Sequence, residues 1–212
     1  FIMQASESII SVCFNASLLE YGGDMAVGAM TILTSINMFA MLPLQGLGQG
    51  AQPIISYNYG AGNPSRVKKA FLLLLKVSLS YSALLWALVM IFPRIFASIF
   101  SSDPMLIAFT ANAIRIYFGC MIIFGIQIAC QMTFLAIGSA KSSIAVAVVR
   151  KFILLIPLIY LMPALFTADR TSAVYAAEPV ADFIAVTFTT ILFVAQFKKV
   201  MKELNAPLSV PQ

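Results

Sequence analysis

The chain contains no histidine, little charge and only three cysteines. Without histidine it lacks the commonest transition-metal ligand and the usual general base of nucleophilic catalysis, which argues against an enzyme. Cys13, Cys120 and Cys130 lie within apolar segments at spacings unlike CxxC, so they are predicted to be packing thiols. The glycines between Gly46 and Gly62 match no GxxxxGK[ST] pattern, and we expect them to serve helix packing and bending instead of phosphate binding.

Charged residues make up 10% of the 212 residues, whereas hydrophobic residues make up 61%. A soluble domain carries roughly 25% charge because its surface faces water. Apolar runs longer than the ~18 residues needed to cross a bilayer recur along the whole length. These features predict an all-α polytopic membrane protein with one domain, residues 1–212. The chain opens on Phe1 without signal-peptide features, so we expect it to begin inside a larger protein.

Six membrane-spanning helices are expected. Their predicted ranges are Phe1–Leu19, Ala26–Tyr59, Ala70–Phe92, Met105–Ile137, Ser142–Pro163 and Tyr175–Phe197. The second range is long enough for two short helices, because no charge occurs between Asp24 and Arg66. Its second half is too polar for a separate lipid-facing span, so we predict one long helix kinked at Pro43.

The basic residues predict the orientation of the chain. Ten of the thirteen fall on one side of the predicted spans: Arg66, Lys68, Lys69, Lys76, Lys141, Arg150, Lys151, Lys198, Lys199 and Lys202. Acidic and basic residues are nearly balanced in the opposite loops. By the positive-inside rule, both chain ends are expected on the cytoplasmic side of the plasma membrane. The rule also accounts for the net charge of +5, so no nucleic-acid partner is expected.

Glu7 is the acid expected deepest within the hydrocarbon region, where an ionisable group costs at least ~2.5 kcal/mol by insertion scales. Gln4, Glu7, Ser11 and Asn15 recur at helical spacing and form a polar stripe on the first helix. Two interpretations stay open. Either the stripe lines a cavity in which Glu7 binds a proton or cation, or Glu7 is a structural acid that snorkels or hydrogen-bonds between helices.

Two other polar pairs are candidates. Gln127 and Gln131 lie one turn apart in the fourth span, and they either line a cavity or join helices through their amides. Glu178 and Asp182 share one face of the sixth helix, where we predict a solvated outer mouth at which Arg115 or Arg170 neutralises the carboxylates. A paired-carboxylate acid and base is the alternative for this second pair.

The run GAQPIISYNYGAGNPSR at residues 50–66 resembles the signature of the multidrug and toxic compound extrusion (MATE) family. Further similarity comes from AIGSAK at 136–141, from residues 150–157 and from AEPVAD at 177–182. The resemblance covers essentially the whole chain and corresponds to the second of the family's two six-helix lobes. It implies two lobes around a central cavity that rock between outward and inward states and expel cationic or amphipathic molecules in exchange for sodium ions or protons.

The resemblance also bears on site residues and partners. Glu7 resembles an acid that binds the coupling cation in some members, but the fourth helix offers Gln127 and Gln131 where those members have a second acid. The coupling ion, sodium or proton, therefore stays open, and no metal ligand set is assigned. The expected partners are a missing N-terminal lobe, the lipid bilayer and small organic substrates, with no further cofactor.

Three alternatives remain beside an exporter. A lipid-linked oligosaccharide flippase of the same superfamily needs a strongly cationic cavity for pyrophosphate, for which Arg115 is the candidate. An intramembrane enzyme needs a nucleophile and a base on facing helices, which the sequence does not offer. A structural membrane fragment without transport activity of its own is the third alternative.

Overall fold

The computed structural model describes the backbone of residues 2–205 and the side chains of residues 7–204. This part of the chain folds into helices and short connections and contains no strand, which confirms the all-α class. The elements are α1 (Ile2–Gly60), α2 (Pro64–Ile91), α3 (Pro93–Ser98), α4 (Pro104–Tyr117), the 3-10 turn η1 (Met121–Ile123), α5 (Phe124–Ala136), α6 (Ala140–Val148), the π-helical η2 (Val149–Leu155), α7 (Ile156–Leu165) and α8 (Arg170–Asn205).

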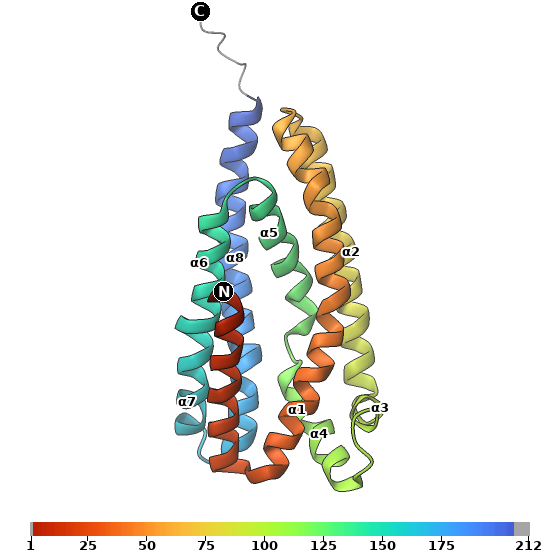
Figure 1. The fold of residues 1–212 in the computed structure, drawn as a ribbon, viewed down its shortest axis with the longest axis vertical. Helices are drawn as coiled ribbons and strands as arrows, with labels where there is room; N and C mark the ends of the chain where they lie inside the picture. The colour runs from red at the N-terminus through yellow and green to blue at the C-terminus, as the bar shows by residue number, and fades with distance from the viewer. Residues whose placement is uncertain (1, 206–212) are drawn as a thin grey trace, which may run out of the picture.

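Helix α1 consists of two rods that meet at Gly23. The backbone there has φ 62° and ψ −161°, a conformation that a residue with a side chain rarely adopts. Figure 1 shows the first rod running down the bundle and the second, longer rod running back up. The turn packs closely on the start of α8, because Thr171 donates a hydrogen bond to the Tyr21 carbonyl at 2.9 Å. Helical backbone continues from there through Pro43 and Pro53 to Gly60.

The remaining long segments also contain breaks that the sequence pattern did not predict. Helices α4 and α5 form one span bent by 51° at η1. Segments α6, η2 and α7 follow one another without a gap, and the π-helical turns lie just before Pro157. Proline lacks an N–H and clashes with the carbonyl four residues earlier, which favours such a local widening of the helix. Helix α8, with 36 residues, is about 54 Å long at 1.5 Å per residue.

Length and composition identify a multi-pass membrane protein. Within the described residues, four helices are long and apolar enough to cross a bilayer, or five when the bent α4–α5 pair is taken as one span. The first of these is α1, which holds both rods. Large apolar side chains such as Phe39, Leu73 and Ile191 are more than 60% exposed, as expected for surfaces that face lipid.

Two apolar cores hold the helices together. The larger core lies between both rods of α1 and helices α4, α7 and α8 and contains Phe14, Leu33 and Tyr175. The smaller core joins α2, α5 and the second half of α8 through Phe71, Phe134 and Phe193. Because lipid is as apolar as these side chains, close packing and not water exclusion stabilises such contacts. A Cβ on Gly125, for instance, would lie 2.5 Å from the Ser78 carbonyl oxygen, so α5 approaches α2 through a residue without a side chain.

The glycines between Gly46 and Gly62 differ in how closely they pack. A Cβ on Gly46, Gly50 or Gly60 would meet nothing within 4 Å among the described residues. Gly48 does pack closely, against Met132, and Gly62 adopts φ 65° in the turn between α1 and α2. Within the described residues, Gly46, Gly50 and Gly60 therefore pack against no other element, and their role in packing or bending stays a prediction.

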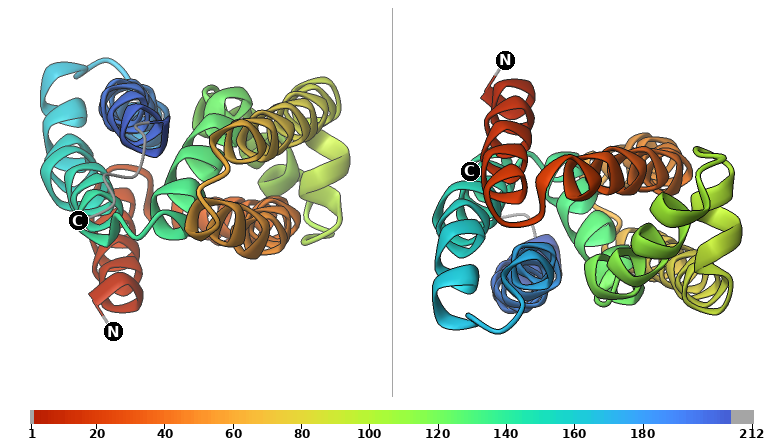
Figure 2. Two further views of the ribbon diagram at one scale, coloured as in Figure 1. Left: turned by 90° about the horizontal axis from the view of Figure 1, so that it is seen from above. Right: turned by 90° about the horizontal axis from the view of Figure 1, so that it is seen from below.

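The two ends of the bundle differ in charge. Helices α1, α5 and α8 end, and α2 and α6 begin, at the same end of the molecule (Figure 1). We call it the basic end, because it carries Arg66, Lys68, Lys69, Lys141, Lys198, Lys199 and Lys202. The opposite end holds the Gly23 turn, α3 and the α7–α8 connection. Figure 2 views the bundle from these two ends, with α6 to α8 on one side and α2 to α5 on the other.

Candidate functional site

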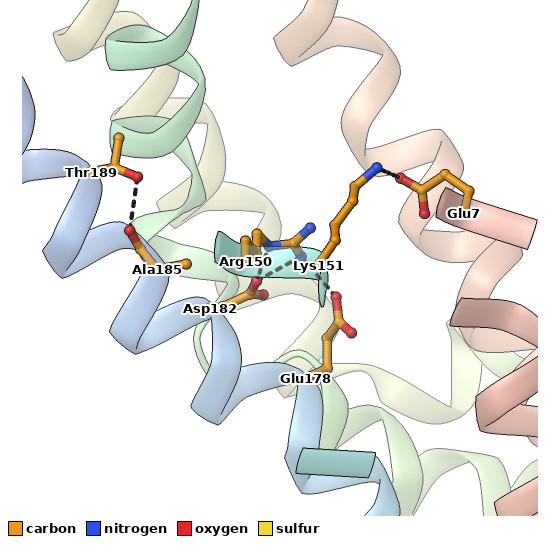
Figure 3. A network of polar contacts seen from close by, with 7 residues as sticks. All are labelled: Glu7, Arg150, Lys151, Glu178, Asp182, Ala185 and Thr189. Carbon is orange, nitrogen blue, oxygen red and sulfur yellow. Dashed lines mark hydrogen bonds and ion pairs between the residues drawn. The ribbon is translucent and has the colours of Figure 1, made fainter. Parts of the chain in front are cut away.

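An arginine in the middle of the bundle binds two carboxylates of α8. Arg150 donates through Nε to Asp182 Oδ1 at 2.7 Å and through Nη2 to Glu178 Oε1 at 2.8 Å (Figure 3). Glu178 and Asp182 are one helical turn apart, so both carboxylates leave the same face of α8. The two acids are 7% and 6% exposed, so both ion pairs are shielded from solvent.

The next residue binds a third acid. Lys151 donates through Nζ to Glu7 Oε1 at 2.5 Å, which joins η2 to the first rod of α1 (Figure 3). The Lys151 side chain is 10% exposed, whereas that of Glu7 is 60% exposed. We call Glu7, Arg150, Lys151, Glu178 and Asp182 the charged network. It connects three segments that are far apart in the sequence and lies among mostly apolar helical residues.

The π-helical segment positions both cations. Arg150 and Lys151 follow directly on Val149, the first residue of η2, and Leu155 ends the segment two residues before Pro157. Adjacent residues on a helix point in different directions, so Arg150 faces α8 while Lys151 faces α1 (Figure 3). Single π-helical turns inside α-helices are frequently found at functional sites, and here one carries two cations.

Charge is not balanced on the α8 side of the network. One guanidinium faces two carboxylates, which leaves one negative charge in excess if both acids are ionised. The guanidinium also lies 5.1 Å from the centre of the Phe124 ring, an apolar contact that replaces water on that side. Ions inside a membrane protein are costly, so they mark functional positions more often than structural ones. A proton or a cation at Glu178 or Asp182 would remove the imbalance.

A small cavity adjoins these carboxylates. It is lined by Asn37, Tyr117, Glu178 and Asp182 together with apolar side chains, and its volume is about 10 Å³. That is close to the smallest space that holds one water molecule. In the described residues, no group of three or more His, Cys, Asp or Glu side chains forms a metal site.

Comparison with known proteins identifies the family. The MatE family model matches residues 1–161, about three quarters of the chain. The chain belongs to the MatE family. Members of this family are transporters and not enzymes.

Two curated proteins are similar to this chain. The FAD transporter of Shewanella oneidensis is 30% identical over 140 residues, which is 66% of this chain and 30% of the relative. The multidrug export protein MepA of Staphylococcus haemolyticus is 22% identical over 188 residues, covering 87% of this chain and 40% of the relative. The chain thus spans less than half the length of these relatives.

Solved structures agree with the family. The multidrug transporter DinF-BH is 32% identical, with a TM-score of 0.79 over 95% of this chain and 44% of that one. A MATE transporter in the bent conformation has a TM-score of 0.88 at 18% identity, over 96% of this chain and 45% of that one. The MatE fold is therefore shared along almost the whole of this chain.

The polar stripe predicted on the first helix lies on an exposed face of the first rod of α1. Glu7, Ser11 and Asn15 are exposed on the first rod, and Glu7 is held by Lys151. The side chain of Gln4 lies outside the described residues. On α5, Gln131 is half-buried, whereas Gln127 is buried and its side-chain oxygen has no hydrogen-bond partner within the described side chains. Roles in cation binding or cavity lining stay predictions for all of these residues.

The prediction for Glu178 and Asp182 needs correction. They do not form a solvated outer mouth, and neither Arg115 nor Arg170 neutralises them, because Arg150 occupies that position. Arg115 is exposed and lines a separate cavity of about 340 Å³ with Arg94 and Asn112. Arg170 lies over the ring of Tyr21 at 5.5 Å. The error arose because both acids are more than one helical turn inside α8, which begins at Arg170.

Arg150 and Lys151 are the site residues that the sequence analysis missed. The positive-inside rule counted them with the cytoplasmic charges at the start of the fifth span, although they lie ten and eleven residues after the start of α6 at Ala140, about 15 Å along the helix. A signal was available. Apolar residues continue on both sides of the Arg-Lys pair, which marks the two cations as intramembrane residues that require acidic neighbours.

Proposed function

We propose that this protein exports small cationic or amphipathic molecules across the plasma membrane in exchange for sodium ions or protons. In this proposal the chain is one lobe of a two-lobe transporter that works by alternating access. The observation that carries it is the binding of Arg150 between Glu178 and Asp182 inside the bundle. The relation to the multidrug export protein MepA supports the substrate class.

The network offers a physical route for ion coupling. A proton or cation that binds Glu178 or Asp182 weakens the attraction between that carboxylate and Arg150, because Coulomb energy falls when one charge is neutralised. Arg150 is attached to η2, a segment with non-standard helix geometry that can change its pairing more readily than a regular helix. The ion thereby biases the position of η2 relative to α8.

Lys151 extends this effect to the first rod. Its ion pair with Glu7 joins η2 to α1, so a shift of η2 changes the contact between the two. Glu7 is exposed on the outer face of the described chain, where a second lobe or a water-filled cavity would meet it. Ion binding at the α8 carboxylates and the position of the first rod are then linked. Such links between two states are the basis of alternating access.

Antiport measurements on the protein as the cell produces it test the proposal. Efflux of a cationic dye from proteoliposomes is compared under separate sodium and proton gradients for wild type, Glu178→Gln and Asp182→Asn. Each neutral variant should lower gradient-driven efflux by roughly 5- to 150-fold, the range of typical coupling free energies. Glu203→Gln is the matched control, because Glu203 lies on the same helix but is exposed at the basic end.

Dye binding without a gradient is measured on the same variants. Retained binding with lost gradient dependence supports a coupling role for the carboxylates. Unchanged gradient-driven efflux in both network variants would contradict it and leave the network as a structural device. Glu7→Gln separates the two halves of the network: lost coupling there supports the link through Lys151, whereas normal coupling confines the ion effect to α8.

A second candidate is export of an anionic nucleotide cofactor. It is favoured by the relative named as an FAD transporter, which is 30% identical over 140 residues. Arg94 and Arg115 line a cavity that suits a phosphate group, and Arg115 was also the residue required for the flippase alternative. Uptake of FAD into inverted vesicles distinguishes the candidates. FAD transport that is lost in Arg115→Gln, with no dye efflux, favours the anionic substrate.

A further inference from the structure

An apolar groove opens at the basic end, away from the charged network. It lies between the start of α2, helix α5 and the last turns of α8, and its volume is about 740 Å³. This is within the ~300–1,000 Å³ of pockets that hold small organic molecules. Neither the proposed ion coupling nor the cavity beside Glu178 uses this groove.

Three aromatic rings in mutual contact line one part of the groove. The centres of Phe71 and Phe193 are 4.6 Å apart, those of Phe193 and Phe197 are 5.0 Å apart, and those of Phe71 and Phe197 are 5.3 Å apart. Leu72 and Val194 line the groove as well and are 40% and 45% exposed. The groove is therefore apolar inside, and its edge continues into exposed apolar side chains of the kind that face the hydrocarbon of the bilayer.

Two lysines stand at the rim of this apolar groove. Lys68 comes from the first turns of α2 and Lys198 from the last turns of α8, and both line the groove and are exposed. Among the ion pairs of the described residues, none involves either lysine. Two cations over an apolar groove at the membrane surface complement a molecule with an anionic head and a hydrocarbon tail. Basic pockets between membrane helices bind anionic lipid head groups in this manner.

We propose that the groove binds an anionic phospholipid, with one acyl chain against the phenylalanines and the head-group phosphate between Lys68 and Lys198. The lipid fills the space between the ends of α2 and α8 and holds these two helices at a fixed separation. A free phosphate lacks the tail that the groove accommodates, and a neutral lipid lacks the charge that the lysines complement. The proposal does not depend on which substrate or ion the transporter uses.

Native mass spectrometry tests the head-group part of the proposal. The purified protein is measured with equal amounts of dioleoyl-phosphatidylglycerol and dioleoyl-phosphatidylcholine. Wild type should retain the phosphatidylglycerol selectively. The double variant Lys68→Ala, Lys198→Ala should lose about 30-fold in that selectivity, since each basic residue near an anionic lipid surface contributes about five-fold. Lys69→Ala with Lys199→Ala is the matched control, because these neighbours carry the same charge on the same helices but do not line the groove.

A second pair of variants tests the acyl-chain part. Val194→Trp fills the groove and should reduce retention of both lipids, whereas Ile191→Trp changes an exposed residue of the same helix outside the groove and should not. Thermal unfolding in detergent checks that every variant folds. Equal selectivity in the Lys68/Lys198 variant and wild type overturns the proposal. Competition by inorganic phosphate at equal concentration also overturns it, because it reveals a plain anion site.

Discussion

Arg150 is the residue on which the charged network depends most. It is the cation that contacts both α8 acids, at 2.7 Å to Asp182 and 2.8 Å to Glu178. Removing one partner of a buried ion pair is far more costly than replacing all partners by neutral groups, because the remaining charge stays buried without compensation. The residue therefore matters for stability as well as for the proposed coupling.

Arg150→Ala should lower the free energy of unfolding by about 3–5 kcal/mol, since it leaves two buried carboxylates facing each other. Adding Glu178→Gln and Asp182→Asn should restore most of that loss, because no charge then remains uncompensated on α8. Circular dichroism recorded during unfolding in a mild detergent measures the free energy of unfolding of both variants. Arg94→Ala, at an exposed arginine, should change stability by less than about 0.5 kcal/mol. A triple variant as unstable as Arg150→Ala would contradict the electrostatic explanation.

Helix α8 illustrates how a single residue outside the bilayer stabilises a long element. Asp169 precedes the helix and accepts a hydrogen bond at Oδ1 from the backbone N–H of Ser172 at 3.0 Å. Asp169 thus caps the N-terminus of α8, which packs on the Gly23 turn. Hydrogen bonds from the side chain and backbone of Ser172 hold the pKa of Asp169 below its ordinary value.

Asp169→Ala should destabilise the helix start by about 1 kcal/mol at neutral pH, the usual cost of losing an N-cap. Because the folded-state pKa is lowered, the stabilisation is present above the unfolded-state pKa of about 3.9 and is lost as the pH falls through the folded-state value. The difference between wild type and Asp169→Ala should therefore shrink in acid. Asp169→Asn retains a cap without a titrating group, so it should remain stable and show no such loss. Thermal unfolding between pH 7 and pH 3 measures the series.

On the scale of the whole molecule, the bundle has one basic end and one end with mixed charge. The basic end gathers the starts of α2 and α6 and the end of α8, although these segments are far apart in the sequence (Figure 1). Arg150 and Lys151 do not belong to it, because they lie inside the bundle. By the positive-inside rule, the remaining cations at the basic end still favour a cytoplasmic location for that end.

Cysteine labelling checks this orientation. In a variant whose Cys13, Cys120 and Cys130 are replaced by serine, Lys199→Cys and Asp24→Cys place one exposed thiol at each end of the bundle. A membrane-impermeant maleimide added to intact cells should label the Asp24→Cys variant and should label the Lys199→Cys variant only after the cells are opened. The reverse pattern would contradict a cytoplasmic basic end.

The sequence by itself determined the all-α class, the membrane as the solvent and the family. Long apolar runs leave no other way to satisfy the backbone in lipid, and the signature at residues 50–66 is local in the chain. It also marked Glu7, Glu178 and Asp182 as unusual acids. It placed the two α8 acids at a solvated mouth, because the predicted span began at Tyr175, whereas α8 begins at Arg170 and contains both acids more than two turns from its start.

Only the tertiary structure decided which charges meet. Arg150 lies 28 residues from Glu178, and Lys151 lies 144 residues from Glu7, so no local spacing predicts either pair. The pairing depends on how η2, α8 and the first rod of α1 pack around one another. Packing depends on the shapes of all three surfaces together, and helical periodicity describes the surface of one helix at a time.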